Sequence, residues 1–417
     1  MPLTPLPAAR LAALDAIVPA APASLPLMEA HGRFLAAGVV ASRALPGCDN
    51  SAMDGWAVRA EETRGANRDR PARLRVVDTV YAGHLPRRAL QPGEAARVFT
   101  GAPLSPGADA VVRQEAARPT DDGSHVDLFV SVAPGHDLRR AGEEVMPGTP
   151  LFPAGQRVDA TVLGVLASLG EATALVRPAP RVAVIATGDE LVPPGQPAQP
   201  HQVFESNRLL VAALAREAGA DVTHLARSRD DEAELHAQLE TLAPQVDVLI
   251  TTGGASVGDK DCVKRVLTRM GARFLVDGVA LKPGKPVAVA RLGSTAVVVL
   301  PGNPGAATVA FDQFARPLLF KHQGVIEQRR VTRARLSEPR HKQAGLTYLV
   351  TVAALEARED SVEPWARLRP QGAGQILQNV AARGWAVLPA GRADFAQGES
   401  VDVQLFDTPD FHAVEAA

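Results

Sequence analysis

The chain has 417 residues and a net charge of −2 at pH 7, so we expect several hydrophobic cores and no extended basic surface for nucleic acid or acidic membranes. Hydrophobic residues make up 46% and charged residues 22%, which is typical of a soluble globular protein. Cys48 and Cys262 are the only cysteines, so neither a disulfide framework nor a structural zinc site is expected, and a reducing cytoplasm fits. Because no apolar run approaches about 20 residues, no membrane span is expected, and the proline-broken N-terminus does not resemble a signal peptide.

The first predicted elements are helical. Leu11, Leu14, Ile17 and Val18 recur at helical spacing, and a second helix is expected from Thr161 to Leu169. We therefore expect residues 1–43 and 136–179 to form one helical linker domain. Residues 44–135 interrupt it with short β-like runs, such as 74–77 and 126–130, separated by proline and glycine. This part is predicted to be an inserted β domain.

The inserted region begins with an unusual polar run from Cys48 to Ala57. Asp49, Asn50, Ser51 and Asp54 lie there within a few residues, next to Gly55. These residue types favour turns, in which polar side chains reach backbone groups or solvent. Taken alone, the run indicates a rigid turn with capping carboxylates.

The region 180–322 alternates strand and helix patterns. Strands are expected at 182–186, 222–225, 246–250 and 297–300, and helices at 208–218, 231–242, 262–270 and 306–320. Alternation of this kind predicts a mostly parallel sheet covered on both faces, a three-layer α/β/α domain. Residues 323–417 carry β-like runs near 348–350 and 385–388, so the whole fold class is α/β plus β, with a small C-terminal β domain.

Polar glycine loops follow three of these strands, where ligands of open parallel sheets bind. Glycines let a ligand approach the backbone, helix N-termini bind anions, and Lys282 and Lys285 add positive charge on a nearby proline-rich loop. A single loop of this type is often only a connector, but three at one sheet edge favour a binding site. The predicted ligand-binding residues of these loops are Thr187, Gly188, Gly253, Gly254, Ser256, Pro301, Gly302 and Asn303.

Carboxylates accompany the loops. The candidate ligands for a divalent cation are Asp189, Glu190, Asp230, Asp259 and Asp261. Asp230 and Asp231 are also residues of the kind that starts a helix, so that reading stays open for them. Mg²⁺ takes one or two protein carboxylates together with substrate phosphates. The combination of loops, lysines and acids therefore predicts a site for a nucleotide or another phosphorylated ligand.

The motifs, in this order, resemble a known family. They are DNSAMDGWA (49–57), FTGAPLSPGADAVV (99–112), RRAGEEV (139–145), ATGDEL (186–191), SNR (206–208), RDD (229–231), TTGGASVGDKD (251–261), LKPGKP (281–286) and LPGNPGAA (300–307). Together they are similar to the molybdopterin molybdenumtransferase family, which includes the bacterial MoeA proteins and the E domain of gephyrin. The resemblance runs from about residue 5 to the end of the α/β region and continues more weakly beyond it.

The resemblance implies a function. Adenylylated molybdopterin and molybdate would be converted to molybdenum cofactor and AMP, with Mg²⁺ required, by a cytoplasmic, elongated four-domain homodimer whose pterin site lies between subunits. Further implied partners are a molybdopterin adenylyltransferase and cofactor-accepting enzymes. The positions that match family residues tied to activity or ligand binding are Asp54, Thr100, Glu190, Asp230, Asp261 and Lys282. Asp54, Glu190 and Asp261 would be catalytic, with Glu190, Asp230 and Asp261 at the metal.

Three departures from the family pattern leave alternatives open. Gly278 replaces a usual lysine, Val350 a usual arginine, and Ala373 a usual serine, so three polar groups suited to an oxyanion are missing. Either Arg367 or Arg369 compensates, or the chain is a diverged paralogue for a different oxyanion or a non-catalytic carrier or scaffold. A molybdopterin adenylyltransferase is a further rival, but the DNSAMDG run and the extra domains argue against it.

Overall fold

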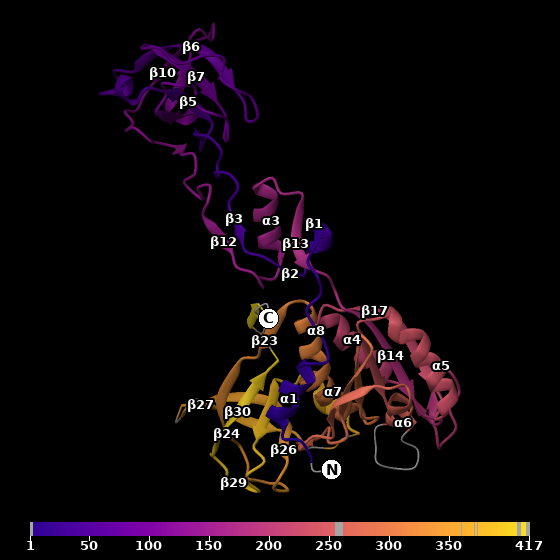
Figure 1. Cartoon of the computed structure of the whole chain (residues 1–417). Coiled ribbons are helices and arrows are strands. Elements are labelled where there is room, and N and C mark those ends of the chain that lie inside the picture. Colours follow the sequence, from indigo (N-terminus) through magenta and orange to yellow (C-terminus); the bar gives the residue numbers. More distant parts are fainter. Residues whose placement is uncertain are drawn as a thin grey trace. The chain divides into compact units, whose positions relative to one another are not determined.

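A computed structural model describes residues 3–254, 262–359, 361–370, 372, 374–406 and 410–413. The chain forms two compact units (Figure 1). The larger unit contains Met1–Ala37, Ala154–Leu163 and Thr173–Ala417, and the smaller unit contains Gly38–Pro153 and Gly164–Ala172. The division into four domains stays a prediction.

The centre of the larger unit is a six-stranded sheet of order β17-β14-β18-β22-β21-β19. Its strands are β17 Asp221–Ser228, β14 Arg181–Thr187, β18 Val248–Thr252, β22 Thr295–Leu300, β21 Ala288–Leu292 and β19 Arg273–Asp277. The first four are parallel, and each coincides with an expected strand. Strands β19 and β21 were not predicted; they add an antiparallel edge to the sheet.

Helices cover this sheet because its strands are apolar on both faces. Val182, Val184 and Ile250 pack in one buried cluster with α4 (Asn207–Glu217) and the segment α7 (Pro304–Ala310), a π-helical turn (Phe311–Ala315) and α8 (Arg316–His322). Ala183, Ile185 and their neighbours pack instead with α5 (Glu232–Leu242) and α6 (Cys262–Arg269). Because successive side chains of a strand point to opposite faces, the sheet contributes to two hydrophobic cores, one on each face.

The region expected to be a helical linker domain contains strands as well as helices. Its residues form α1 Leu6–Leu14, α2 Leu27–Ala30 and α3 Ala160–Ser168, but also the sheet β1 (Ala23–Pro26), β13 (Thr173–Arg177) and β2 (Phe34–Leu35). Further pairs are β3 (Val39–Val40) with β12 (Pro150–Phe152), and β4 (Asn50–Ser51) with β11 (Leu138–Arg139). Pro19 and Pro22 lie between α1 and β1, where proline disfavours continuation of the helix. Helix α1 packs into the α/β core through Ala9 and Ala13.

The smaller unit is mainly β. Its sheet has the order β8-β5-β7-β6-β10-β9, formed by β8 Ala110–Arg113, β5 Gly55–Val58, β7 Glu94–Val98, β6 Ala72–Val80, β10 His125–Leu128 and β9 Ala117–Pro119. Trp56 and Val112 belong to one buried cluster of this sheet, and Val98 and Val111 to another. The expected β runs at 74–77 and 126–130 correspond to β6 and β10.

The C-terminal part of the larger unit is a closed five-stranded barrel. The ring consists of β26 Thr347–Arg358, β27 Ser361–Leu368, β24 Val331–Leu336, β30 Ser400–Leu405 and β28 Gly384–Leu388, and β28 pairs back to β26. Strand β20 (Leu281–Lys282) adds to β26 from the α/β part. Outside the ring lie β15 Leu191–Val192, β16 Val203–Phe204, β23 Val325–Gln328, β31 Asp410–Ala413, β25 Arg340–His341 and β29 Asp394–Phe395.

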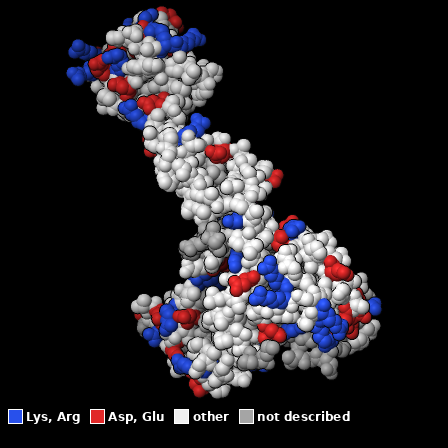
Figure 2. Space-filling model, viewed as in Figure 1, with Lys and Arg blue, Asp and Glu red and all other residues white. Residues whose placement is uncertain are grey.

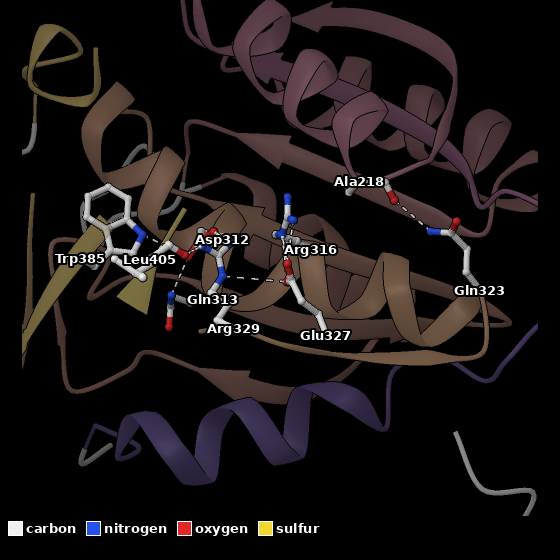
Figure 3. Close-up of polar contacts among 9 residues, drawn as sticks. All are labelled: Ala218, Asp312, Gln313, Arg316, Gln323, Glu327, Arg329, Trp385 and Leu405. Atoms are coloured by element: carbon white, nitrogen blue, oxygen red, sulfur yellow. Dashed lines mark hydrogen bonds and ion pairs between the residues drawn. The ribbon is translucent and has the colours of Figure 1, made fainter. Parts of the chain in front are cut away.

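Buried polar contacts join the barrel to the helices of the α/β part (Figure 3). The Asp312 carboxylate accepts hydrogen bonds from Arg329 and, at 3.1 Å, from Trp385 Nε1. Arg316 Nε donates to Glu327 Oε1 at 2.8 Å, and both side chains are largely buried. Charge-assisted bonds of this kind are directional, so they orient β28 against the π-helical turn and β23 against α8.

The surface carries both signs of charge, in keeping with a net charge of −2 (Figure 2). On the face shown, acidic and basic side chains are interspersed. Among the described residues, no helix is long and apolar enough to cross a membrane.

Candidate functional site

A cavity of about 730 Å³ lies in the larger unit where β14, β18 and β22 end. Nine of the predicted ligand-binding or metal residues line it: Thr187, Gly188, Glu190, Asp230, Gly253, Gly254, Pro301, Gly302 and Asn303. The carboxyl ends of parallel strands meet at one sheet edge, so loops far apart in sequence converge there. The structure therefore brings most of the predicted loop residues into one site.

The glycines of these loops are required by loop packing. Gly253 has a φ of +94°, and a Cβ there would lie 2.2 Å from the Thr187 carbonyl oxygen. A Cβ on Gly302 would lie 3.4 Å from Gly253 Cα. The loops after β14, β18 and β22 thus touch through bare backbone, and a side chain would separate them. The sequence suggested close approach of a ligand, whereas here the glycines admit neighbouring loops.

Asn207, at the start of α4, ties two of the loops together. Its Nδ2 donates to Thr252 Oγ1 at 2.9 Å and to the Gly302 carbonyl at 2.6 Å. Thr252 Oγ1 in turn donates to the Pro301 carbonyl at 3.2 Å. Both Asn207 and its buried neighbour Glu205 line the cavity, and neither was predicted as a site residue. The SNR motif, which contains Asn207, is the sequence feature from which this residue could have been predicted.

Two predicted metal ligands face the same cavity. Glu190 and Asp230 both line it, and the Glu190 carboxylate lies close to Gly188, where a Cβ would meet its oxygens at 2.7 and 2.8 Å. Among the described residues there is no group of three acidic, histidine or cysteine side chains placed to hold a metal. Mg²⁺ needs only one or two protein carboxylates when phosphates supply other ligands, so this donor set fits it.

Other predicted residues fall elsewhere. Lys282 and Lys285 are exposed and do not line the cavity, although Pro286 of the same loop does. Lys282 Nζ lies 5.1 Å from the centre of the Tyr348 ring. Ser256, Asp261 and Ala373 lie outside the described residues.

Asp54 and Thr100 form a separate pair in the smaller unit. The Thr100 backbone N–H and hydroxyl each donate to Asp54 Oδ1 at 2.8 Å. The backbone bond first, and then the hydroxyl bond, lower the pKa of Asp54 below its ordinary value of 3.8. The carboxylate is therefore fixed in position and kept ionised.

Two of the three departures from the family pattern, Gly278 and Val350, lie within the described residues, and each residue fits its place in the fold. Gly278 has a φ of +80°, a conformation that a lysine would adopt only with strain. Val350 is 3% exposed and packs in the barrel core. Arg367 bonds Glu356 and Arg369 donates to the carbonyls of Leu377 and Val380, so both suggested substitutes already have partners.

Comparison with known proteins covers nearly the whole chain. Residues 5–170 match the family described as MoeA N-terminal region (domain I and II), and residues 183–321 match the probable molybdopterin binding domain. Molybdopterin molybdenumtransferase 2 of Mycobacterium tuberculosis (strain ATCC 25618 / H37Rv) is 43% identical over 332 residues, which cover 77% of this chain and 81% of that protein. Molybdopterin molybdenumtransferase of Synechococcus elongatus is 33% identical over 392 residues, which cover 93% and 95%.

A solved structure agrees with these relatives. The molybdopterin biosynthesis MoeA protein from Pyrococcus horikosii has a TM-score of 0.79 and 27% identity, covering 97% of this chain and 100% of that one. On the strength of the matched regions and the identities, the chain belongs to the molybdopterin molybdenumtransferase family.

Proposed function

We propose that the chain inserts molybdate into adenylylated molybdopterin and releases AMP. The phosphorus–oxygen bond between the pterin phosphorus and the bridging oxygen breaks, a water oxygen takes its place on that phosphorus, and AMP leaves with the bridging oxygen. The two thiolates of the pterin bind molybdenum in place of one molybdate oxygen, which takes up two protons and leaves as water. The observation that carries the proposal is the cavity of about 730 Å³, in which three glycine loops meet two carboxylates. This volume lies within the usual range for small-molecule sites.

Binding of the phosphates would fall to the loop backbone. Asn303 is the N-cap of α7, so the first N–H groups of that helix are directed toward the end of the cavity that Gly302 and Asn303 line. Thr187, Gly253 and Gly254 complete the wall on the other loops. Lys282 and Lys285, outside the cavity, would attract the anionic substrate toward this side of the unit.

The cation would be held by Glu190 and Asp230, with Asp261 as the third ligand suggested by the sequence. Bound there, Mg²⁺ would supply positive charge that offsets the charge on the phosphate oxygens. Glu190 and Asp261 are proposed as catalytic carboxylates of the larger unit for this reason.

Asp54 is the proposed catalytic carboxylate of the smaller unit. Its bonds with Thr100 keep it ionised and oriented, so it can position water or molybdate by accepting a hydrogen bond. The family resemblance supports the same role. A cytoplasmic homodimer that exchanges intermediates with an adenylyltransferase and with cofactor-accepting enzymes belongs to the same proposal.

The test is AMP release from adenylylated molybdopterin by the purified chain with Mg²⁺ and molybdate. We expect release by the wild type, and a higher Mg²⁺ requirement in Glu190→Gln and Asp230→Asn. Glu240→Gln, which removes an exposed carboxylate of α5 away from the cavity, serves as the matched control. Equal Mg²⁺ dependence in all three variants would contradict the assigned cation ligands.

A carrier function is the second candidate, favoured by the burial of Val350 where the family usually has an arginine. It predicts that the wild type binds adenylylated molybdopterin but releases no AMP with molybdate. Release with tungstate alone would instead indicate a changed oxyanion preference.

A further inference from the structure

Four side chains of the smaller unit form a stacked column. Arg97 of β7 lies over two rings, with Cζ 5.2 Å from the centre of the Trp56 ring and 5.0 Å from that of Phe99. Phe99 stacks on Tyr81, with ring centres 4.7 Å apart and planes 8° from parallel. Each contact limits the freedom of the next ring, so the column is ordered before any ligand binds.

The column runs from the core to the surface. Trp56 is 6% exposed, whereas Tyr81 is 52% exposed although its ring is stacked on Phe99. The exposed His84 ring stands edge-on to Tyr81, with centres 6.2 Å apart and planes at 70°. An aromatic ring that is held in place and half open to solvent offers a stacking surface at little cost in conformational entropy.

The same column is tied to Asp54. Arg97 Nη1 donates to the carbonyl of Gly55, the next residue along the chain, at 3.3 Å, and Nη2 donates to Gln114 Oε1 at 2.7 Å. The Gln114 backbone N–H donates to the Asp54 carbonyl at 3.1 Å. Thr100, which fixes the Asp54 carboxylate, directly follows Phe99.

The turn that carries Tyr81 lies against this loop as well. A Cβ on Gly101 would be 3.7 Å from Ala82 Cβ, so residues that follow β6 and β7 are in contact next to the Asp54 partner. The stacking surface and the fixed carboxylate therefore belong to one end of one sheet. A ligand that meets Asp54 can reach an aromatic face without leaving that end.

We infer that Tyr81 stacks on a fused, nitrogen-containing aromatic bicycle of the substrate, a purine or a pterin. The identification of this ligand as part of the substrate rests on the proposed function. Its flat aromatic character is inferred from the ordered stack of Arg97, Phe99 and Tyr81. Flat heterocycles stack on aromatic side chains through their π-faces whatever their hydrogen-bonding edge. Tyr81 is thus a substrate-positioning residue on the Asp54 side of the reaction.

The composition of the chain allows a direct test. Tyr81 and Tyr348 are its two tyrosines, and Tyr348 is 8% exposed within the barrel. In full-length protein labelled with 3-fluorotyrosine, Tyr81→Phe assigns the two ¹⁹F resonances. Addition of AMP or of unsubstituted pterin should shift the Tyr81 resonance saturably, and ribose 5-phosphate, which lacks the bicycle, should not. Comparison of AMP with pterin shows which ring is bound.

The variants Tyr81→Ala and Tyr81→Phe separate stacking from structure. We expect Tyr81→Ala to weaken binding of the effective probe and to raise the KM for adenylylated molybdopterin about tenfold with little change in kcat, because alanine removes a base stack. Tyr81→Phe should retain wild-type values. Leu85→Ala, an 85% exposed residue of the same turn region, is the control and should also retain them.

Failure of the stacking site and failure of the proposed catalytic function give different results. A Tyr81 resonance that neither probe moves, or a Tyr81→Ala chain that binds the probes as Leu85→Ala does, would overturn the inference even if AMP release is normal. A saturable Tyr81 shift in a chain that releases no AMP would support the stacking site and overturn only the proposed catalytic function.

Discussion

The cavity of the larger unit and the Asp54 pair of the smaller unit are built in opposite ways. In the cavity, position is defined by backbone: Gly253 and Gly302 let loops touch, and Asn207 bonds across them. At Asp54, position is defined by two bonds from one residue, Thr100, to one carboxylate oxygen. The first arrangement fixes a shape, and the second fixes a charge.

Because the two regions are built differently, they are sensitive to different substitutions. The cavity should lose its shape when a side chain is added at a glycine contact, because the added atoms push the touching loops apart. A fixed charge fails when the charge is removed, while the fold hardly depends on it, since Asp54 is only partly buried. Stability and activity should therefore respond separately to changes in the two regions.

The largest effect is expected from Gly253→Ala. The new Cβ would meet the Thr187 carbonyl at 2.2 Å in a backbone with φ of +94°, so overpacking and strain act together. We expect a loss of about 3 kcal/mol in the free energy of unfolding by urea, together with loss of substrate binding. Gly271→Ala is the control, because its φ is +80° but nothing lies within 4 Å; it should cost about 1 kcal/mol. Equal costs would contradict the importance of loop contact.

The next effect concerns the fixed charge. Asp54→Asn keeps an oxygen that can accept from Thr100 but removes the negative charge, so AMP release should fall about 100-fold with only a small loss in the free energy of unfolding by urea. Asp121→Asn, which neutralises an exposed carboxylate elsewhere in the smaller unit, should leave both unchanged. A normal rate in Asp54→Asn would remove the proposed catalytic role.

The strands and helices of the α/β part could be predicted from the sequence because local patterns decide them. Strands β14, β18 and β22 are buried and largely apolar runs. Asp231 caps α5 by accepting from the Glu234 N–H, as its position before that helix suggested. The antiparallel strands β19 and β21 were missed. Strand β21 is placed by pairing with β22, and β19 by pairing with β21, and no local pattern specifies either pairing.

The site was predictable in its loops but not in its internal contacts. Topology alone places Thr187, Gly253 and Gly302 at one sheet edge. Whether Gly253 makes room for a ligand or for Thr187 depends on distances that arise only after folding. Likewise, the stack of Tyr81 on Phe99 follows from the register that places Val80 opposite Val98, and the sequence gives no sign of it.

A smaller effect is expected where the cavity depends on one side chain. Asn207→Ala removes the donor shared by Thr252 and Gly302, so we expect a loss of about 1–3 kcal/mol and a raised KM. Asn67→Ala, at an exposed turn of the smaller unit, gives the matched loss of an amide and should not change KM. If the KM of Asn207→Ala were normal, the loops would hold their shape without this tie.

The smallest effect tests the fixed charge directly. Thr100→Val removes the hydroxyl bond to Asp54 but keeps the backbone bond, so the pKa of Asp54 should rise part of the way toward its ordinary value of 3.8, whereas Thr100→Ser should keep it low. The sign follows from linkage: a carboxyl whose pKa is lowered by folding favours the folded state above its unfolded pKa, and that contribution is lost as the pH falls through the folded value. NMR titration of Asp54 in the three proteins measures the shift. An unchanged pKa in Thr100→Val would mean that the backbone N–H alone fixes the carboxylate, and the threonine hydroxyl would then have to serve the substrate instead.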